Sequence, residues 1–320
     1  ALETGRFYAE RGARQFSGRY SIGYWPWELA QWPEDWTLVF GLVDDVWVST
    51  THIRDSLLTA EPAFTKPLQV MPLVVEVADA PRLRAPATRR TTRKRFKLPA
   101  RATLFCFSFD LNSSIHRKNP QAVVESFLRA FPLEQYPVDH VGLVVKVQVP
   151  RKLHRAWEQL KRIASADPRI HIIEGSLPRA DLLALYAACD CFVSLHRAEG
   201  FGRGLAEALQ LGLHLIATDY SGNTDFCRRA EFTDQVSAVP WRWVKVKPGQ
   251  YPYAEGQRWA NPDIPAAAAA MRRFVDNPPR AATPPPEGWP CFSARELGET
   301  YAARLREIVE RRRTGLKALP

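Results

Sequence analysis

The stretch His196-Arg197-Ala198-Glu199-Gly200-Phe201-Gly202-Arg203-Gly204-Leu205-Ala206-Glu207-Ala208-Leu209 decides the fold of this chain. The apolar run at residues 191–195 precedes it and predicts a buried parallel strand. Apolar residues at helical spacing over 205–209, ended by Gly212, predict a short helix. The next apolar run, residues 214–218, reads as a second strand. This order predicts a parallel α/β sheet, in which ligands bind beyond the carboxyl ends of the strands.

The residues between strand and helix suit a ligand that carries both phosphate and hydroxyl groups. Gly200, Gly202 and Gly204 permit tight turns and close approach of a ligand. The free amides and positive dipole end of the following helix attract a diphosphate. Glu199 and Glu207 would repel phosphate, but they can accept hydrogen bonds from sugar hydroxyls. Together these features predict a nucleoside diphosphate sugar as ligand.

The same stretch resembles the E-x7-E motif of retaining family 4 glycosyltransferases of the GT-B fold, here Glu199-x7-Glu207. The run E-G-F-G followed by G-L-x-E-A-L is the more specific part. The resemblance covers about residues 22–275 and points to a bacterial mannosyltransferase-like subgroup. It implies that Glu199 faces the donor sugar and Glu207 the nucleotide ribose, with Gly200, Phe201 and Gly202 at the donor.

Two other interpretations of this stretch remain open. Glu207 and Glu199 are compatible with an ordinary helix surface and a solvated loop. A dinucleotide fingerprint with Asp219 as ribose ligand is the other, but it needs a glycine where Leu205 stands.

A second loop carries two adjacent cations, Arg117 and Lys118, after an apolar strand at residues 104–110. Arginine chelates phosphate and lysine supplies a point charge, although a plain surface loop is the alternative. The segment resembles the family's F-D-x-x-S-x-x-x-R-K-N-P. By that match Lys118 binds the diphosphate and Arg117 assists. Where many family members carry an arginine this chain has Asn112, so Ser113 is expected to hydrogen-bond instead.

Four further residues are candidate donor ligands because they end predicted parallel strands. Lys146 closes the apolar run 141–147, and a surface lysine is its alternative. His196 ends the central strand, where a structural role is equally expected. Gly222 and Asn223 form a turn that resembles S-G-N-T-D-F of a family 4 subgroup. Arg203, at the helix start, adds charge to the expected phosphate pocket.

The aromatic-rich segment 24–36 reads as a packed loop or as a wall against sugar rings. Its G-Y-W-x-W-E-L resembles a stretch that faces the cleft in many family 4 enzymes. Trp27 and Glu28 are therefore candidate acceptor-side residues.

Composition favours anionic partners and a globular chain. The 320 residues carry a net charge of +10, and five cysteines suggest free thiols in a reducing cytoplasm. No apolar run is long enough to span a bilayer. The charge agrees with peripheral contact to an anionic membrane and leaves nucleic-acid binding as an alternative.

The fold class expected is α/β, with a partial and a complete Rossmann-like domain. We expect four segments: a partial acceptor-side domain at 1–81, a basic interdomain linker at 82–98, a nucleotide-sugar-binding domain at 99–290, and a C-terminal helix at 291–320 that crosses back to the first domain. The few N-terminal strands suggest an N-terminal domain that is either reduced or truncated.

The sequence thus predicts a retaining hexosyltransferase, with mannosyl among the sugars considered. Its donor is a nucleoside diphosphate sugar and its acceptor a saccharide or a lipid-linked saccharide. We expect neither a cofactor nor a metal, and no nucleic acid as a partner. The alternatives are a donor-binding protein without turnover and a basic nucleic-acid-binding protein.

Overall fold

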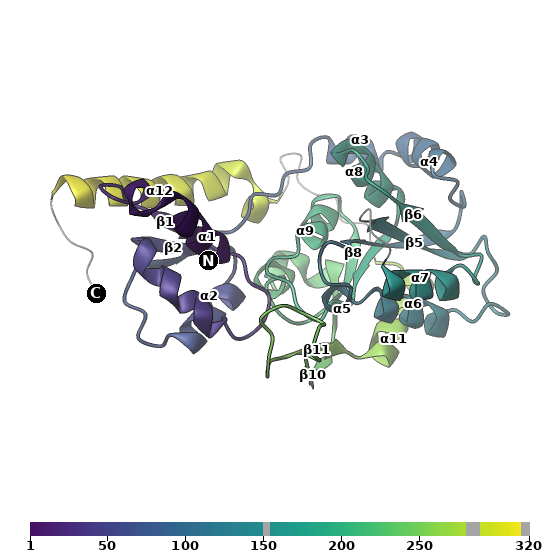
Figure 1. Cartoon of the computed structure of the whole chain (residues 1–320). Helices are drawn as coiled ribbons and strands as arrows, with labels where there is room; N and C mark the ends of the chain where they lie inside the picture. The colour runs from purple at the N-terminus through teal and green to yellow at the C-terminus, as the bar shows by residue number, and fades with distance from the viewer. Residues whose placement is uncertain (150–153, 280–288, 315–320) are drawn as a thin grey trace.

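The computed structural model describes residues 1–149, 154–279 and 289–314. The chain forms two lobes, each built on a parallel sheet, with a long C-terminal helix reaching from one to the other (Figure 1). The larger lobe confirms the α/β class expected from the strand and helix pattern.

The large sheet has six strands, all parallel, in the order β6-β5-β4-β7-β8-β9. Its central strands β4, β5 and β7 are almost continuously apolar and buried, as a sheet covered on both faces requires. The strands are β4 (Thr103–Asp110), β5 (Val141–Gln148), β6 (Ile170–Glu174), β7 (Cys191–Ser194), β8 (His214–Thr218) and β9 (Val236–Val239).

Helices cover both faces of this sheet. One face packs on α6 (Pro120–Ala130), α7 (Arg155–Ala164) and α11 (Ile264–Asp276). The other packs on α8 (Arg179–Ala188) and α9 (Arg203–Gln210). Short segments complete the lobe: α5 (Ile115–Lys118), α10 (Thr224–Cys227), η3 (Ala230–Gln235) and η4 (Pro290–Phe292). Cys189 and Cys191 are buried free thiols, as expected.

The small sheet has three parallel strands, β1 (Ile22–Tyr24), β2 (Asp45–Val48) and β3 (Leu68–Val70), in that order. Around it lie α1 (Leu2–Arg11), η1 (Ala13–Gln15), η2 (Glu34–Leu42) and α2 (Thr51–Ala60). Residues 1–21 contribute α1 and η1 to this lobe.

The C-terminal helix α12 (Ala294–Arg313) lies along the small lobe (Figure 1). Ser293 caps its start by accepting a hydrogen bond from the Glu296 amide at 3.1 Å. Arg304 reaches the buried Asp45 of β2, with Nη2 2.6 Å from Oδ2. A helix at the end of the chain therefore completes the core of the first lobe.

A hairpin inserted between β9 and α11 also reaches the small lobe. Strands β10 (Trp241–Lys245) and β11 (Arg258–Pro262) pair antiparallel. Trp259 and Ala254 of this insert share one apolar cluster with Trp25, Trp27 and other residues of the aromatic segment. The two lobes are thus joined by a common core.

The segment expected as a basic interdomain linker, residues 82–98, is largely helical and packs on the large lobe. It contains most of α3 (Ala80–Arg84) and all of α4 (Pro86–Arg95), which pack against α8. Arg93 is buried and donates to Asp190 and to the Ala188 carbonyl, while Arg89 also pairs with Asp190. The physical reason is that these guanidinium groups meet unpaired carbonyls and a carboxylate at the end of α8.

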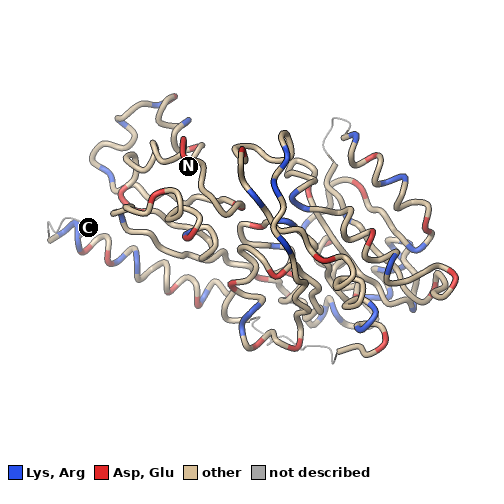
Figure 2. The backbone as a smooth tube through the Cα atoms, turned by 90° about the horizontal axis from the view of Figure 1, so that it is seen from below, with Lys and Arg blue, Asp and Glu red and all other residues tan. Residues whose placement is uncertain are grey.

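Those contacts bear on the predicted membrane surface. Arg89, Arg93 and Arg95 are engaged by Asp190 and Asp181. Acidic and basic positions also alternate along α12 (Figure 2). Among the described residues, no helix is both long and apolar enough to cross a bilayer. Membrane contact therefore stays a prediction.

Candidate active site

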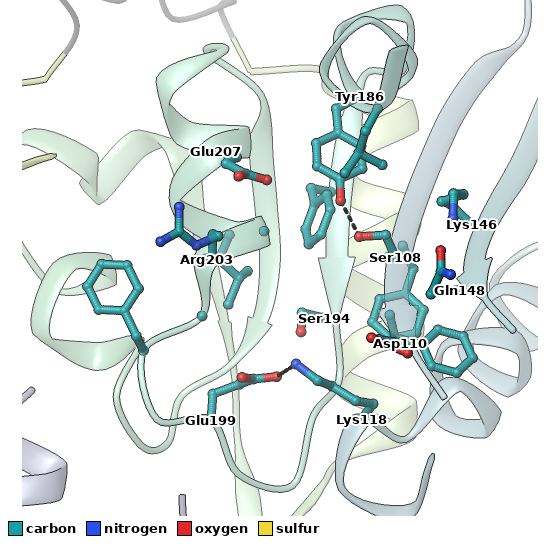
Figure 3. Close-up of a pocket in the computed structure, with 18 of the residues that line it drawn as sticks. Ser108, Asp110, Lys118, Lys146, Gln148, Tyr186, Ser194, Glu199, Arg203 and Glu207 are labelled. Carbon is teal, nitrogen blue, oxygen red and sulfur yellow. Dashed lines mark hydrogen bonds and ion pairs between the residues drawn. The ribbon is translucent and has the colours of Figure 1, made fainter. Parts of the chain in front are cut away.

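A cavity of about 670 Å³ opens at the carboxyl ends of β4, β5 and β7 and faces the first turn of α9. The small lobe contributes Pro26, Glu28, Ser49 and Leu73 to its wall. Its size lies in the range of cavities that hold nucleotide-sized ligands. Figure 3 shows the polar side chains that point into it.

Lys118 and Glu199 meet in this cavity. The Lys118 Nζ atom lies 2.5 Å from Glu199 Oε1, although the two residues are 81 positions apart (Figure 3). Asn119 holds the end of α5 against β7 by donating to the Leu195 carbonyl at 2.8 Å. Burial alone would raise the pKa of Glu199, but Lys118 and Arg117 outweigh it and lower the pKa to about 2. Glu199 is therefore a carboxylate that can accept hydrogen bonds but has no proton to donate.

Arg117 lies behind Glu199 rather than in the cavity. Its side chain is 6% exposed, and Nη1 is 3.3 Å from Glu199 Oε2 and donates to the Ala198 carbonyl at 2.9 Å. The expectation that Arg117 assists Lys118 directly at the diphosphate is therefore not met. Helix α5 is a single turn, so neighbouring side chains on it point in different directions.

Two glycines shape the loop that carries Glu199. Gly202 has φ of 94° at the start of α9, a conformation that other residues adopt only under strain. At Gly222 a Cβ atom would lie 2.1 Å from the Gly200 carbonyl oxygen. The Gly222 amide donates to the Glu199 carbonyl at 2.8 Å, so this turn supports the loop from behind. Gly200 and Phe201 line the cavity, whereas Gly222 does not.

Glu207 lies in the second turn of α9 and also lines the cavity. Its buried carboxylate accepts from Arg179 of α8, with Nη1 2.6 Å from Oε1. Arg203, at the start of the same helix, is exposed and lines the cavity, with its guanidinium turned away from the strand ends (Figure 3). Within the described chain no carboxylate lies within ion-pair distance of Arg203.

Of the other predicted cations and hydroxyls, one lines the cavity. Lys146 does so, and it donates to the Gly175 carbonyl at 2.5 Å while burial lowers its pKa. Ser113 is not among the lining residues. Its neighbour Asn112 donates to Asp110, which does line the cavity.

His196 and Asn223 are buried behind the cavity wall. Hydrogen bonds join His196 Nδ1 to Ser194 Oγ and His196 Nε2 to Asn223 Oδ1, both at 2.9 Å. Burial lowers the pKa of His196 and keeps the ring neutral. These residues orient Ser194, which faces the cavity.

The two acceptor-side candidates separate in the structure. Trp27 is buried in the aromatic cluster and donates to the Gln31 carbonyl at 2.8 Å. Glu28 lines the cavity, and its carboxylate accepts from the Tyr251 hydroxyl at 2.5 Å.

Several lining residues were not predicted. Ser108, Asp110 and Gln148 end strands β4 and β5, so the rule on strand ends could have found them. Arg179 and Tyr186 come from α8, and no sequence signal marks them. Among the described residues, no three His, Cys, Asp or Glu side chains gather as metal ligands would, and the absence of a metal or cofactor stays a prediction.

Residues 150–239, which contain α7 to β9, match the family model described as Glycosyl transferases group 1. Solved structures match a far larger part of the chain. The pneumococcal O-GlcNAc transferase GtfA, solved with UDP and GlcNAc, superposes with a TM-score of 0.59 at 14% identity over 91% of this chain. The fold is GT-B.

Two further GT-B structures are similar. The α,α-trehalose 6-phosphate synthase from Burkholderia multivorans gives a TM-score of 0.60 at 15% identity over 93% of this chain. A glycosyltransferase from Rickettsia africae gives 0.61 at 13% identity over 96%. The chain spans 53% of the pneumococcal protein, 68% of the Burkholderia one and 80% of the Rickettsia one. No curated protein sequence matches the chain.

Proposed function

We propose that this protein transfers a hexosyl unit from a nucleoside diphosphate sugar to a hydroxyl group of a saccharide or lipid-linked saccharide. The observation that carries the proposal is the meeting of Lys118 and Glu199 in one cavity with the start of α9. The match of residues 150–239 to the glycosyltransferase model supports the class of reaction. Retention of configuration, and mannose as the sugar, rest on the resemblance to family 4.

The leaving diphosphate would lie between Lys118 and the first turn of α9. No side chain caps this helix, so its first amides are available to phosphate oxygens. As the bond from the anomeric carbon to the phosphate oxygen breaks, its electron pair moves to that oxygen. Lys118 and the helix amides stabilise the growing negative charge in a geometry that exists before the reaction.

Arg203 would provide the second cation at the diphosphate. The family's arginine is replaced by Asn112 in this sequence, and Arg117 points away from the cavity. Lys118 and Arg179 are each paired with a carboxylate, whereas Arg203 is exposed at the start of α9. A guanidinium there can bind two phosphate oxygens at once.

The carboxylates would hold the two polyol ends of the donor. Glu199, ionised at any physiological pH, accepts hydrogen bonds from the sugar and favours positive charge on its ring in the transition state. Glu207 accepts hydrogen bonds from the ribose hydroxyls, as the resemblance implies. Arg179, which pairs with Glu207 in the structure, then either moves aside or binds the ribose as well.

The test is a transfer assay with UDP-, GDP-, ADP- and dTDP-linked hexoses and saccharide acceptors. Glu199→Gln and Lys118→Ala are expected to lower turnover at least a hundredfold while the far-UV spectrum is unchanged. Glu125→Gln, on the exposed face of α6, is the matched control. Product anomeric coupling constants measured by NMR test retention. Wild-type turnover in both variants would overturn the proposed site, and donor binding without any transfer would favour the alternative of a protein that only binds the donor.

A further inference from the structure

Glu28 is held from two sides by residues of the large lobe. Its Oε2 atom accepts from the Tyr251 hydroxyl at 2.5 Å, and its Oε1 atom lies 3.5 Å from Arg117 Nη2. Its backbone carbonyl is joined to His52 Nε2 at 2.8 Å. The carboxylate is therefore fixed at both oxygens, whereas a group that waits for an acceptor would leave one of them open.

Arg117 is shared between two carboxylates. Nη2 faces Glu28 at 3.5 Å and Nη1 faces Glu199 at 3.3 Å, while the guanidinium lies over the Tyr251 ring, 5.8 Å from its centroid. Glu199 in turn shares its other oxygen with Lys118. The four charged groups Glu28, Arg117, Glu199 and Lys118 form a continuous row whose formal charges cancel.

Tyr251 belongs to the turn between β10 and β11, which contacts both the small lobe and the segment that carries Lys118. Next to it, the Gln250 carbonyl accepts from the Ser114 hydroxyl at 2.7 Å, so the turn also holds the start of α5. The Tyr251 ring lies 5.8 Å from that of Trp27. One short segment thus contacts the elements that carry Glu28, Arg117 and Lys118.

We infer that Glu28 and Tyr251 are positioning residues, which act through Arg117 on Glu199, and that Glu28 is not an acceptor ligand. This inference rests on the proposed function. Glu28 and Glu199 compete for the guanidinium of Arg117. The hydrogen bond that the Tyr251 hydroxyl donates to Glu28 weakens the interaction of Glu28 with Arg117. This balance sets where the Glu199 carboxylate lies, whereas the net charge of the row sets how strongly it attracts the diphosphate.

Removing the charge of Glu28 has a distinctive expected result. In Glu28→Gln the row of four groups gains a net positive charge, so a nucleoside diphosphate binds more tightly, by about three- to tenfold. Turnover falls about tenfold or more, because Arg117 then pulls Glu199 from its working position. The KM for the acceptor stays within about twofold of the wild type, since Glu28 does not touch it.

Removing the Tyr251 hydroxyl tests the position of the Glu199 carboxylate without changing the net charge of the row. Tyr251→Phe keeps all four charges, so nucleoside diphosphate affinity stays within about twofold while turnover falls about tenfold. Tyr253→Phe, in the same turn, and Glu34→Gln, in the same aromatic segment, are matched controls on exposed residues and should behave as the wild type.

The experiment measures UDP, GDP, ADP and dTDP affinity by calorimetry and kcat and acceptor KM by steady-state kinetics on the full chain. Tighter diphosphate binding with lower kcat in Glu28→Gln, and lower kcat alone in Tyr251→Phe, support the inference. A raised acceptor KM with unchanged diphosphate affinity in Glu28→Gln overturns it, as do two variants that match the wild type. If the wild type itself binds none of the four diphosphates, the proposed function fails first and the inference with it.

Discussion

Arg304 and Asp45 are 259 residues apart and form a buried ion pair, with Nη2 2.6 Å and Nε 2.9 Å from one carboxylate oxygen. Asp45 is fully buried at the start of β2, and Arg304 reaches it from the middle of α12. The last helix is therefore attached to the first lobe by an ion pair that solvent does not reach.

Arg304→Ala should lower the free energy of unfolding by about 3–5 kcal/mol, because it leaves a buried carboxylate without its partner. Arg306→Ala, an exposed residue of the same helix, is the control and should change stability little. The double variant Asp45→Val with Arg304→Met should regain most of the loss. Chemical denaturation measures all three. A loss below about 1 kcal/mol in Arg304→Ala would contradict the role given to the pair.

The pKa of Glu199 predicts how acid acts on the protein. The folded value of about 2 lies below the ordinary 4.5, so the stability that Glu199 contributes is complete above pH 4.5 and disappears as the pH falls toward 2. The stability difference between wild type and Glu199→Gln should therefore be largest at neutral pH and shrink below pH 4.5. Denaturation curves at pH 7, 4 and 3 measure it. A difference that does not vary with pH would show that Glu199 is not held ionised.

Glu207 should distinguish nucleotides from bare diphosphate. Glu207→Ala is expected to weaken binding of the preferred nucleoside diphosphate about tenfold, because a charged acceptor for the ribose hydroxyls is lost. Pyrophosphate has no ribose, so its affinity should not fall. Calorimetry with both ligands checks this, and an equal loss for both would place the ribose elsewhere.

Arg203→Ala should weaken nucleoside diphosphate and pyrophosphate equally, by about tenfold, and reduce the dependence of binding on salt. The reason is that this cation serves the phosphates alone. Arg242→Ala, exposed on β10 and not among the residues that line the cavity, removes the same charge and should leave affinity unchanged. Equal affinities in Arg203→Ala and wild type would show that Arg203 does not bind the diphosphate and that another cation of the cavity does.

Gly222→Ala should destabilise the protein by about 2 kcal/mol or more, because the new Cβ would lie 2.1 Å from the Gly200 carbonyl oxygen. Gly41→Ala meets nothing within 4 Å and is the matched control. Thermal melting compares the two. A melting temperature of Gly222→Ala equal to that of the control would mean that the loop behind Glu199 can shift to accommodate the Cβ atom without loss of stability.

The sequence by itself determined the elements of the large lobe and the loop that carries Glu199. Apolar runs such as residues 191–195 and helical spacing over 205–209 act through neighbours along the chain, and β7, α9 and β8 follow them. Glu199 and Lys118 could be predicted to meet because both follow parallel strands, whose carboxyl ends lie at one edge.

Tertiary structure alone decided which side chains surround that pair. Arg117 and Lys118 are adjacent in sequence, yet Arg117 turns behind Glu199 toward Glu28 and Tyr251, and only Lys118 enters the cavity. The basic segment 82–98 became helical because Asp190 and the end of α8 happen to lie opposite its arginines. Arg304 pairs with Asp45 because the packing of α12 on the small lobe brings the two residues together. Such contacts depend on how distant elements pack, and spacing along the chain carries no information about that packing.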